Sequence, residues 1–363
     1  MALPTTRVYL RSPYYVNLTR ANLEKIVIDL YVYTGTLTTD KPADYQYRLY
    51  CTAFDGYAEI DISEFARDYI EVNFDGSYTT NSVWLEWDLY YADDGDTTIT
   101  LEGSYTATGL NGFGYFEDGY NPTPATWLQM SSDYVLVPEK TRLRIPVLQD
   151  YLTGYQFARG GFLINNVTGL TTTENTANVF RYVDTLNYET QQPDRIILKY
   201  SNRADEVVRI KYFCPREENQ VKVTFINKYG ALQDLWFYGA SKTSMQTSKD
   251  TYKRNILSGG TYDTDRHQMK IISKNGVSSM NAISNFYPED SNATFMELLL
   301  SEWVWASIKN TDLNQNKFLE KTEITFPVNV KNDSLQFKTR ANDGLISYTF
   351  DFEFASDRIN SVR

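Results

Sequence analysis

The chain has 363 residues, which is too long for one ordinary β-sandwich, and its 42% hydrophobic and 22% charged residues exclude a disordered chain. Its net charge of −11 argues against general binding to nucleic acid or anionic membranes, because like charges repel. The 29 Tyr, 19 Phe and 6 Trp residues favour β-strands and surfaces that contact partners. The composition therefore predicts an all-β protein with two to three sandwich-like domains.

The first residues show no charged region followed by a continuous apolar core, so the sequence predicts no signal peptide. No uninterrupted apolar run reaches the roughly 18 residues that a membrane span needs. The two cysteines, Cys51 and Cys214, lie far apart and match neither a disulfide framework nor a zinc cluster. We therefore expect a protein that is made and folded in a cytoplasm.

Residues 1–110 predict an N-terminal β-sandwich. Ser63 is expected to cap a short helix, because its hydroxyl can accept a backbone N–H of the first turn. In the strand predicted for 83–91, the alternation points Trp84 and Tyr90 away from the core. The strand patterns of this domain, separated by turn residues, occupy 26–33, 45–51, 83–91 and 97–105.

A stretch rich in glycine, proline and aromatic residues, 106–126, follows the first domain. It contains no GxxxxGK[ST] pattern and no helix signal after it, so it does not predict a phosphate site. We interpret it as a connector whose aromatic side chains pack against a neighbour. The second β-rich domain spans 111–215. Its predicted strands occupy 134–137, 143–148, 161–167, 179–186, 195–200 and 207–213.

The C-terminal β domain, 216–363, opens with a predicted hairpin over 219–239. Its first strand alternates apolar residues with Lys222 and Thr224, which is typical of a half-buried strand. The turn at 227–230 contains Asn and Gly, which tolerate the backbone conformations of tight turns. The following segment, 240–268, is rich in Ser, Thr and Lys, and predicts a long loop or extended arm.

One helix is predicted over 294–308, where Thr294 and Glu297 have the spacing of a capping box. The apolar residues that recur at helical spacing, and that we expect in the core, are Phe295, Leu298, Leu299 and Trp303. Beyond the helix, 324–330 and 335–340 predict a hairpin. The alternation over 345–355 predicts the closing strand.

The sequence predicts no catalytic residues, no cofactor and no metal site. A single histidine, His267, argues against His-rich metal sites and weakens any Ser–His–Asp arrangement. The Glu217-Glu218 pair has the right chemistry for glycoside cleavage, but the chain has 46 acidic residues and such pairs are uninformative. The turn carboxylates of 93–96 supply hard oxygen ligands, yet they lack the spacing of an EF-hand loop.

Several stretches together resemble virion structural proteins of tailed bacteriophages, particularly tail and baseplate components. The resemblance touches both ends of the chain and is weakest between 125 and 215. The stretches that carry it are SPYYVNL (12–18), ISEFARDYIEV (62–72), FGYFEDGYNP (113–122), FINKYGALQDLWFYG (225–239), LLLSEWVW (298–305), FPVNV (326–330) and YTFDFEFA (348–355).

The resemblance implies a structural subunit of the tail, the hub or baseplate, or the neck ring, located in the virion and assembled in the bacterial cytoplasm. It implies contacts with copies of the chain in a ring and with other virion proteins: tail, portal or adaptor, or fibre proteins. It implies no catalytic residue, and no nucleic acid or membrane as partner. The interface candidates in the two predicted arms are Tyr115, Phe116, Tyr120, Tyr252 and Tyr262.

Two other functions are consistent with the sequence. The first is a module of the same particle that binds host glycan, with Trp84, Tyr90 and Tyr115 as stacking platforms for sugar rings. The second is a polysaccharide-degrading tail enzyme that uses a pair of acidic residues.

Overall fold

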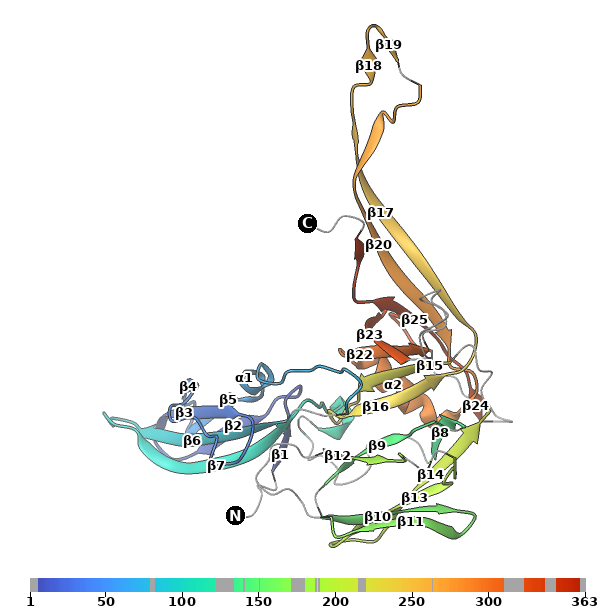
Figure 1. The fold of residues 1–363 in the computed structure, drawn as a ribbon. Helices are drawn as coiled ribbons and strands as arrows, with labels where there is room; N and C mark the ends of the chain where they lie inside the picture. Colours follow the sequence, from blue (N-terminus) through green and yellow to red (C-terminus); the bar gives the residue numbers. More distant parts are fainter. Residues whose placement is uncertain are drawn as a thin grey trace. The chain divides into compact units, whose positions relative to one another are not determined.

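The computed structural model describes residues 6–78, 82–119, 121, 134–139, 141–149, 151–170, 180–186, 188, 190–214, 220–262, 264–309, 323–336 and 344–359. This part of the chain is mainly β, as the sequence predicts, and it is built from several sheets (Figure 1). It divides into two compact units. The first comprises Met1–Cys214, Phe225–Asp234 and Ala293–Ser301, and the second comprises Pro215–Thr224, Leu235–Asn292 and Glu302–Arg363.

The N-terminal part of the first unit contains a five-stranded sheet in the order β1-β7-β6-β3-β4 and a two-stranded sheet, β2-β5. The alternating residues of β3 and β6 supply the core, in which Ile26, Ile28 and Leu30 are fully buried. Helix α1 (Ser63–Arg67) contributes Ala66 to the same core. The strands are β1 (Arg7–Tyr9), β2 (Tyr15–Thr19), β3 (Leu23–Tyr33), β4 (Tyr47–Thr52), β5 (Tyr57–Asp61), β6 (Val83–Asp93) and β7 (Thr100–Leu110).

The second β-rich part of this unit has a five-stranded sheet in the order β11-β10-β13-β14-β8 and a two-stranded sheet, β12-β9. Phe157, Ile196 and Leu198 lie at the centre of its core. The sequence pattern missed β10, which contains one glycine and several polar residues. The strands are β8 (Tyr134–Pro138), β9 (Arg144–Leu148), β10 (Leu152–Arg159), β11 (Phe162–Thr168), β12 (Phe180–Asp184), β13 (Arg195–Tyr200) and β14 (Glu206–Phe213).

An eight-stranded sheet contains the C-terminal strands in the order β16-β15-β22-β23-β25-β20-β17, with β26 paired to β20. Phe237 contacts both Phe350 and Phe352, with ring centroids 5.7 and 5.5 Å apart. The strands are β15 (Val221–Ile226), β16 (Leu232–Phe237), β17 (Ser241–Lys253), β20 (Met269–Ile283), β22 (Val304–Lys309), β23 (Glu323–Val330), β25 (Thr349–Phe354) and β26 (Arg358–Ile359).

Short elements complete the described chain. Two-stranded pairs form between β18 (Leu257–Ser258) and β19 (Thr261–Tyr262), and between β21 (Tyr287–Pro288) and β24 (Leu345–Ile346). The other short elements are the 3-10 turns η1 (Phe116–Asp118) and η2 (Glu289–Ser291) and the helix α2 (Asn292–Leu300).

The structure corrects the predicted helix. It ends at Leu300 rather than near 308, and 304–309 form strand β22 instead. Phe295 and Leu298 are buried as predicted, whereas Trp303 is exposed and lies outside the helix. The β-branched and aromatic residues after position 303 pack on a pleated sheet more readily than on a helix.

The hairpin over 219–239 forms, but its first strand is buried on both faces and not on one. Lys222 and Thr224 are buried together with their apolar neighbours. The neighbours of β15 in the sheet, β16 and β22, pair its two edges, and burial of both faces means that other segments cover the sheet on both sides at β15. The sequence predicts a second hairpin from 324–330 and 335–340. Residues 335–336 do not form a strand, and 337–340 lie outside the described residues.

Candidate interaction surface

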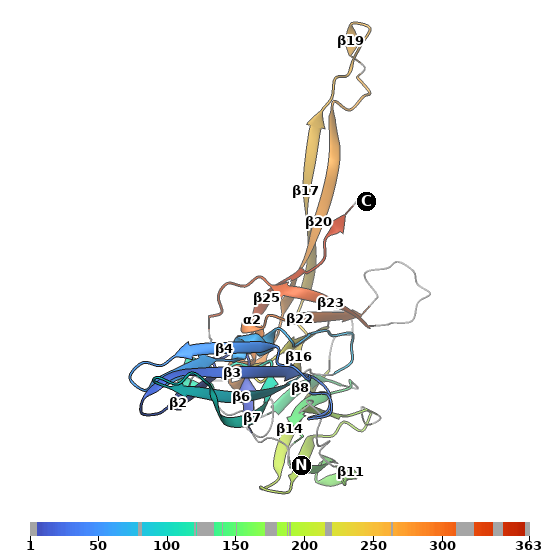
Figure 2. The same ribbon diagram turned by 90° about the vertical axis from the view of Figure 1, so that its left-hand side faces the viewer.

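The segment predicted as a long loop or arm is one half of a two-stranded antiparallel ribbon, β17 paired with β20. The register runs from Ser241 opposite Ala282 to Lys253 opposite Met269, with one bulge after Asp250. Figures 1 and 2 show the two strands running side by side beyond β22, β23 and β25, with β19 at the far end of the ribbon. At about 3.3 Å per residue, a strand of this length extends for roughly 40 Å.

The ribbon exposes its side chains to an unusual degree. Every side chain of β17 from Lys242 to Lys253 is exposed. On β20, β25 pairs only with the stretch from Ser279 to Ile283, and β26 pairs only at Asn275 and Gly276. A two-stranded hairpin is marginally stable alone in water, so a ribbon of this length is typical of a segment that contacts another molecule.

The outer half of the ribbon carries both apolar and basic side chains. Its exposed apolar residues are Tyr252, Leu257, Tyr262, Met269, Ile271 and Ile272. A surface of this mixed kind resembles a protein interface, in which apolar groups supply burial and charges supply orientation. The sequence pattern missed the contribution of 269–272, because Met, Lys, Ile and Ile in succession show no two-residue alternation.

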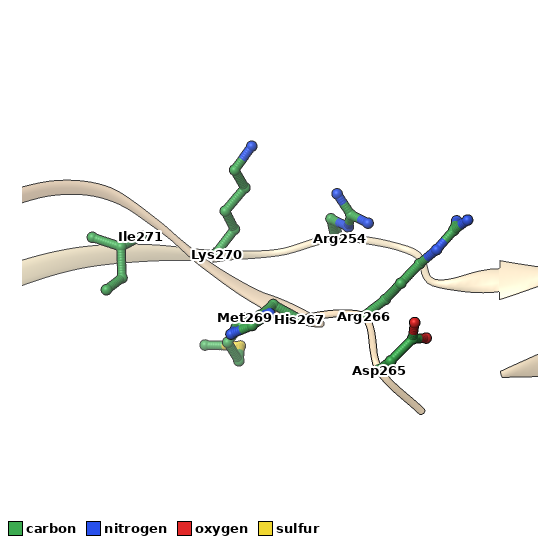
Figure 3. Close-up of a pocket in the computed structure, with 7 residues that line it drawn as sticks. All are labelled: Arg254, Asp265, Arg266, His267, Met269, Lys270 and Ile271. Atoms are coloured by element: carbon green, nitrogen blue, oxygen red, sulfur yellow. The ribbon is translucent and has the colours of Figure 1, made fainter. Parts of the chain in front are cut away.

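A pocket of about 530 Å³ lies near the tip of the ribbon. In Figure 3 the side chains of Arg254, Arg266 and Lys270 extend to one side of the two chain segments, and Met269 extends to the opposite side. The single histidine, His267, is exposed at this pocket rather than held in a buried site. The residues that line the pocket are Arg254, Asp265, Arg266, His267, Met269, Lys270 and Ile271.

Charge is distributed unevenly along the chain. Residues 241–283, which contain the ribbon, have seven Lys and Arg and three Asp, which gives +4 against −11 for the whole chain. Residues 1–110 have seven Lys and Arg but seventeen Asp and Glu, which gives −10. Residues 127–214 are close to neutral, with ten basic and nine acidic residues. The acidic and basic parts of the protein are therefore separate, and they are complementary in sign.

The predicted interface aromatics occupy different environments. Tyr252 and Tyr262 are exposed on the ribbon, and Phe116 is 100% exposed on η1. Tyr115 is only half-buried, and its hydroxyl oxygen is enclosed without a hydrogen-bond partner among the described residues. Tyr120 lies outside the described residues. Of these residues, Tyr252 lies on β17 and Tyr262 on β19, near the tip of the ribbon.

The expectation that Trp84 presents an exposed ring is wrong. Its side chain is fully buried against Tyr33 and Leu37, and its indole N–H donates to the carbonyl of Gly35 at 3.0 Å. The chain that follows β3 therefore covers the outward-pointing face of β6 at this position. Tyr90, farther along the same strand, is half-buried.

The hairpin turn between β15 and β16 packs against the segment after β7 and is hydrogen-bonded to it. Phe113 donates its backbone N–H to the carbonyl of Lys228 at 2.8 Å. Gly230 has φ of +88°, and a Cβ placed on it would lie 2.8 Å from the backbone carbon of Asn111. Asn227 accepts the backbone N–H groups of Tyr229 and Ala231 on its side-chain oxygen. The first part of the predicted connector is thus packed within the first unit.

A buried carboxyl group adjoins this turn. Glu297 of α2 accepts the backbone N–H of Lys228 at 3.4 Å, and burial raises its pKa to about 7. Lys228 Nζ lies 3.6 Å from an Asp118 oxygen and 4.8 Å from the centre of the Tyr115 ring. Burial also raises the pKa of Tyr229, to about 12. Sequence patterns did not point to this cluster, because its members come from three separate segments.

Replacing Glu297 with glutamine is expected to stabilise the protein at pH 8 and leave its stability nearly unchanged at pH 4. The folded pKa lies above the ordinary value of 4.5, so the folded state keeps a proton that the unfolded state loses. Stability is then lost as the pH rises from 4.5 to about 7, by at most about 3 kcal/mol. Urea unfolding midpoints between pH 4 and pH 8 measure this. An unchanged pH dependence in the variant would contradict the assignment.

The acidic groups considered for metal binding or catalysis have other roles where the structure describes them. Arg20 Nε donates to both Asp93 oxygens, at 3.0 and 3.1 Å, and the side chain of Asp96 accepts the Asp93 backbone N–H. Glu217 and Glu218 lie outside the described residues. Within the described chain, no cluster of three or more His, Cys, Asp or Glu side chains has the arrangement of a metal site.

None of the helices described is both long enough and apolar enough to cross a bilayer.

Comparison with known proteins gave no match to any protein-family model and none to a curated protein sequence.

Proposed function

We propose that this protein is a structural subunit of a tailed-phage virion, part of the tail, the hub or baseplate, or the neck ring, that acts without catalysis. Its contacts in the particle are with copies of itself and with other virion proteins. The observation that supports this proposal most strongly is the exposed β17–β20 ribbon. Long strands that leave the body of a domain are a common means of adding backbone hydrogen bonds to a neighbouring sheet.

The composition of the exposed surface supports the same proposal. The apolar and tyrosine side chains of the outer ribbon remain in water in the single chain. Exposed apolar surface of this kind marks contact sites in soluble proteins. Tyrosine is suited to such contacts because only two side-chain torsions have to be fixed on binding. An assembly subunit gives this surface a partner.

The alternative of a host-glycan-binding module loses one of its stacking platforms, because the Trp84 ring is buried. The acid pair named for the alternative of a polysaccharide-degrading enzyme, Glu217 and Glu218, lies outside the described residues. The assembly function is the one that uses the ribbon.

The proposal is tested by imaging and mass measurement. Sedimentation and negative-stain images of the purified full chain are expected to give rings or higher oligomers. Gold-labelled antibodies against the chain are expected to decorate the tail or neck of intact phage particles that encode it. A chain that stays monomeric at all concentrations, together with particles that contain none of it, would overturn the proposal.

A further inference from the structure

One long edge of the ribbon, the outer edge of β17, has no neighbouring strand among the described residues. β17 is the last strand of its sheet, so among the described strands it pairs only with β20. Its outward edge therefore presents backbone N–H and C=O groups along thirteen residues, Ser241–Lys253. Proteins usually blunt or cover an edge of this length, because it is a template for strand pairing. The edge is long enough to take a full strand from another molecule.

A second edge of the chain matches it. β4 is the last strand of the N-terminal five-stranded sheet and pairs with β3 on one side only. Aromatic side chains are exposed along it and just beyond it, Tyr50 at 67% and Phe54 at 87%. Exposed carboxylates surround it: Asp44 precedes the strand, Asp55 follows it and Glu59 lies on β5. The apolar side chains of β4 and the carboxylates of Asp44, Asp55 and Glu59 around it thus complement the apolar and basic groups on the ribbon. The charged residue of β4 itself, Arg48, is paired with Asp29.

Three other edge strands, β11, β16 and β1, fit the ribbon less well. β11 also exposes apolar residues, Phe162 and Leu163, but it belongs to the near-neutral part of the chain. β16 is almost entirely buried along its length. β1 has three residues, all buried. Of these edges, β4 is therefore the one that combines exposed apolar groups with exposed carboxylates in the residues around it.

On these grounds we propose that the outer edge of β17 in one copy pairs with the outer edge of β4 in the N-terminal sandwich of a second copy of this chain. The proposal rests on the assembly function proposed above and deepens it by naming the two surfaces. Because the two surfaces differ, the contact is head-to-tail, and repetition generates a ring or a tube. Backbone pairing supplies affinity, and the opposite charges select the partner edge.

A charge-reversal series tests this pairing. The ribbon variant carries Lys249→Glu and Lys253→Glu, and the acceptor variant carries Asp44→Lys and Glu59→Lys; all four side chains are exposed. Asp55 is left unchanged because its φ of +51° disfavours lysine. Sedimentation equilibrium of the full chain at low salt is expected to show self-association weakened at least tenfold in each variant. The variant that combines all four changes is expected to recover the wild-type association constant within about threefold.

A matched control separates the specific contact from total charge. Arg209→Glu with Lys211→Glu makes the same charge change as the ribbon variant, at two exposed side chains of β14. This control is expected to associate like the wild type. Zero-length carbodiimide cross-linking of a mixture of ¹⁴N- and ¹⁵N-labelled copies is expected to join ribbon lysines to Asp44 or Glu59 in mixed-isotope peptides.

The outcomes distinguish this inference from the assembly function. Self-association that is unaffected by all the variants overturns the inference and leaves the assembly function standing. A chain that never self-associates overturns the inference, and absence of the chain from particles overturns the assembly function as well. Cross-links from ribbon lysines to Asp44 or Glu59 that occur only in single-isotope peptides show that the ribbon pairs within its own chain, which also overturns the inference. The inference is also overturned if the wild type binds duplex DNA and the ribbon variant loses that binding but still self-associates.

Discussion

Replacing Trp84 with alanine is expected to lower the free energy of unfolding by about 3–5 kcal/mol, the usual cost of removing a large buried aromatic side chain. The ring is fully buried, and its N–H is bonded to the carbonyl of Gly35. The substitution leaves a cavity beside Tyr33 and Leu37 and an acceptor without its donor. Urea unfolding followed by circular dichroism measures the change.

Tyr90→Ala is the control, because it removes an aromatic ring from the same strand at a half-buried position. It is expected to cost less than half as much. If Trp84→Ala leaves stability unchanged but abolishes binding to host glycan, the buried position of the ring is wrong and the glycan-binding alternative regains its platform.

Replacing Gly230 with alanine is expected to cost about 3 kcal/mol or more, since it combines a disfavoured backbone conformation with a steric clash. The φ of +88° is one that side chains rarely adopt. The added Cβ would lie 2.8 and 2.9 Å from backbone atoms of Asn111, which belong to a packed strand end and cannot rotate away as a side chain does. The unfolding midpoint in urea is the measurement.

Gly95 provides the matched control for this variant. It has nearly the same φ, +89°, but nothing lies within 4 Å of the added Cβ. Gly95→Ala is therefore expected to cost only about 1 kcal/mol, the backbone part alone. Equal losses in the two variants would mean that the contact between the turn and Asn111 does not form.

Strands with clear alternation were predictable from the sequence. β6 forms over the predicted segment, and the residues assigned to the core, Val83, Leu85, Trp87 and Leu89, are buried. The alternation did not predict whether other segments cover the face of a strand that it assigns to solvent. Trp84 and Thr224 both lie on faces that the alternation assigns to solvent, and both are buried by other segments. Tertiary covering of a sheet is not encoded in a two-residue period.

The candidate surface was predictable in part. The Ser-, Thr- and Lys-rich segment indicated an arm, and that segment forms β17 and the tip. Its pairing with β20 was not predictable, because register between distant strands depends on tertiary context. The predicted C-terminal end of the helix, near 308, is wrong for a similar reason. Val304 and Trp305 continue a helical apolar stripe, but their side chains are buried in strand β22.

The order of strands in the eight-stranded sheet has a consequence for synthesis on the ribosome. β25 follows β20 and β23 in the chain but lies between them in the sheet, so the sheet is continuous only when β25 is inserted. Until translation reaches residue 354, the sheet remains in two parts, and the edges of β23 and β20 that pair with β25 have no partner strand. Truncated or stalled chains therefore expose pairing edges that the complete chain hides, which makes them prone to aggregate.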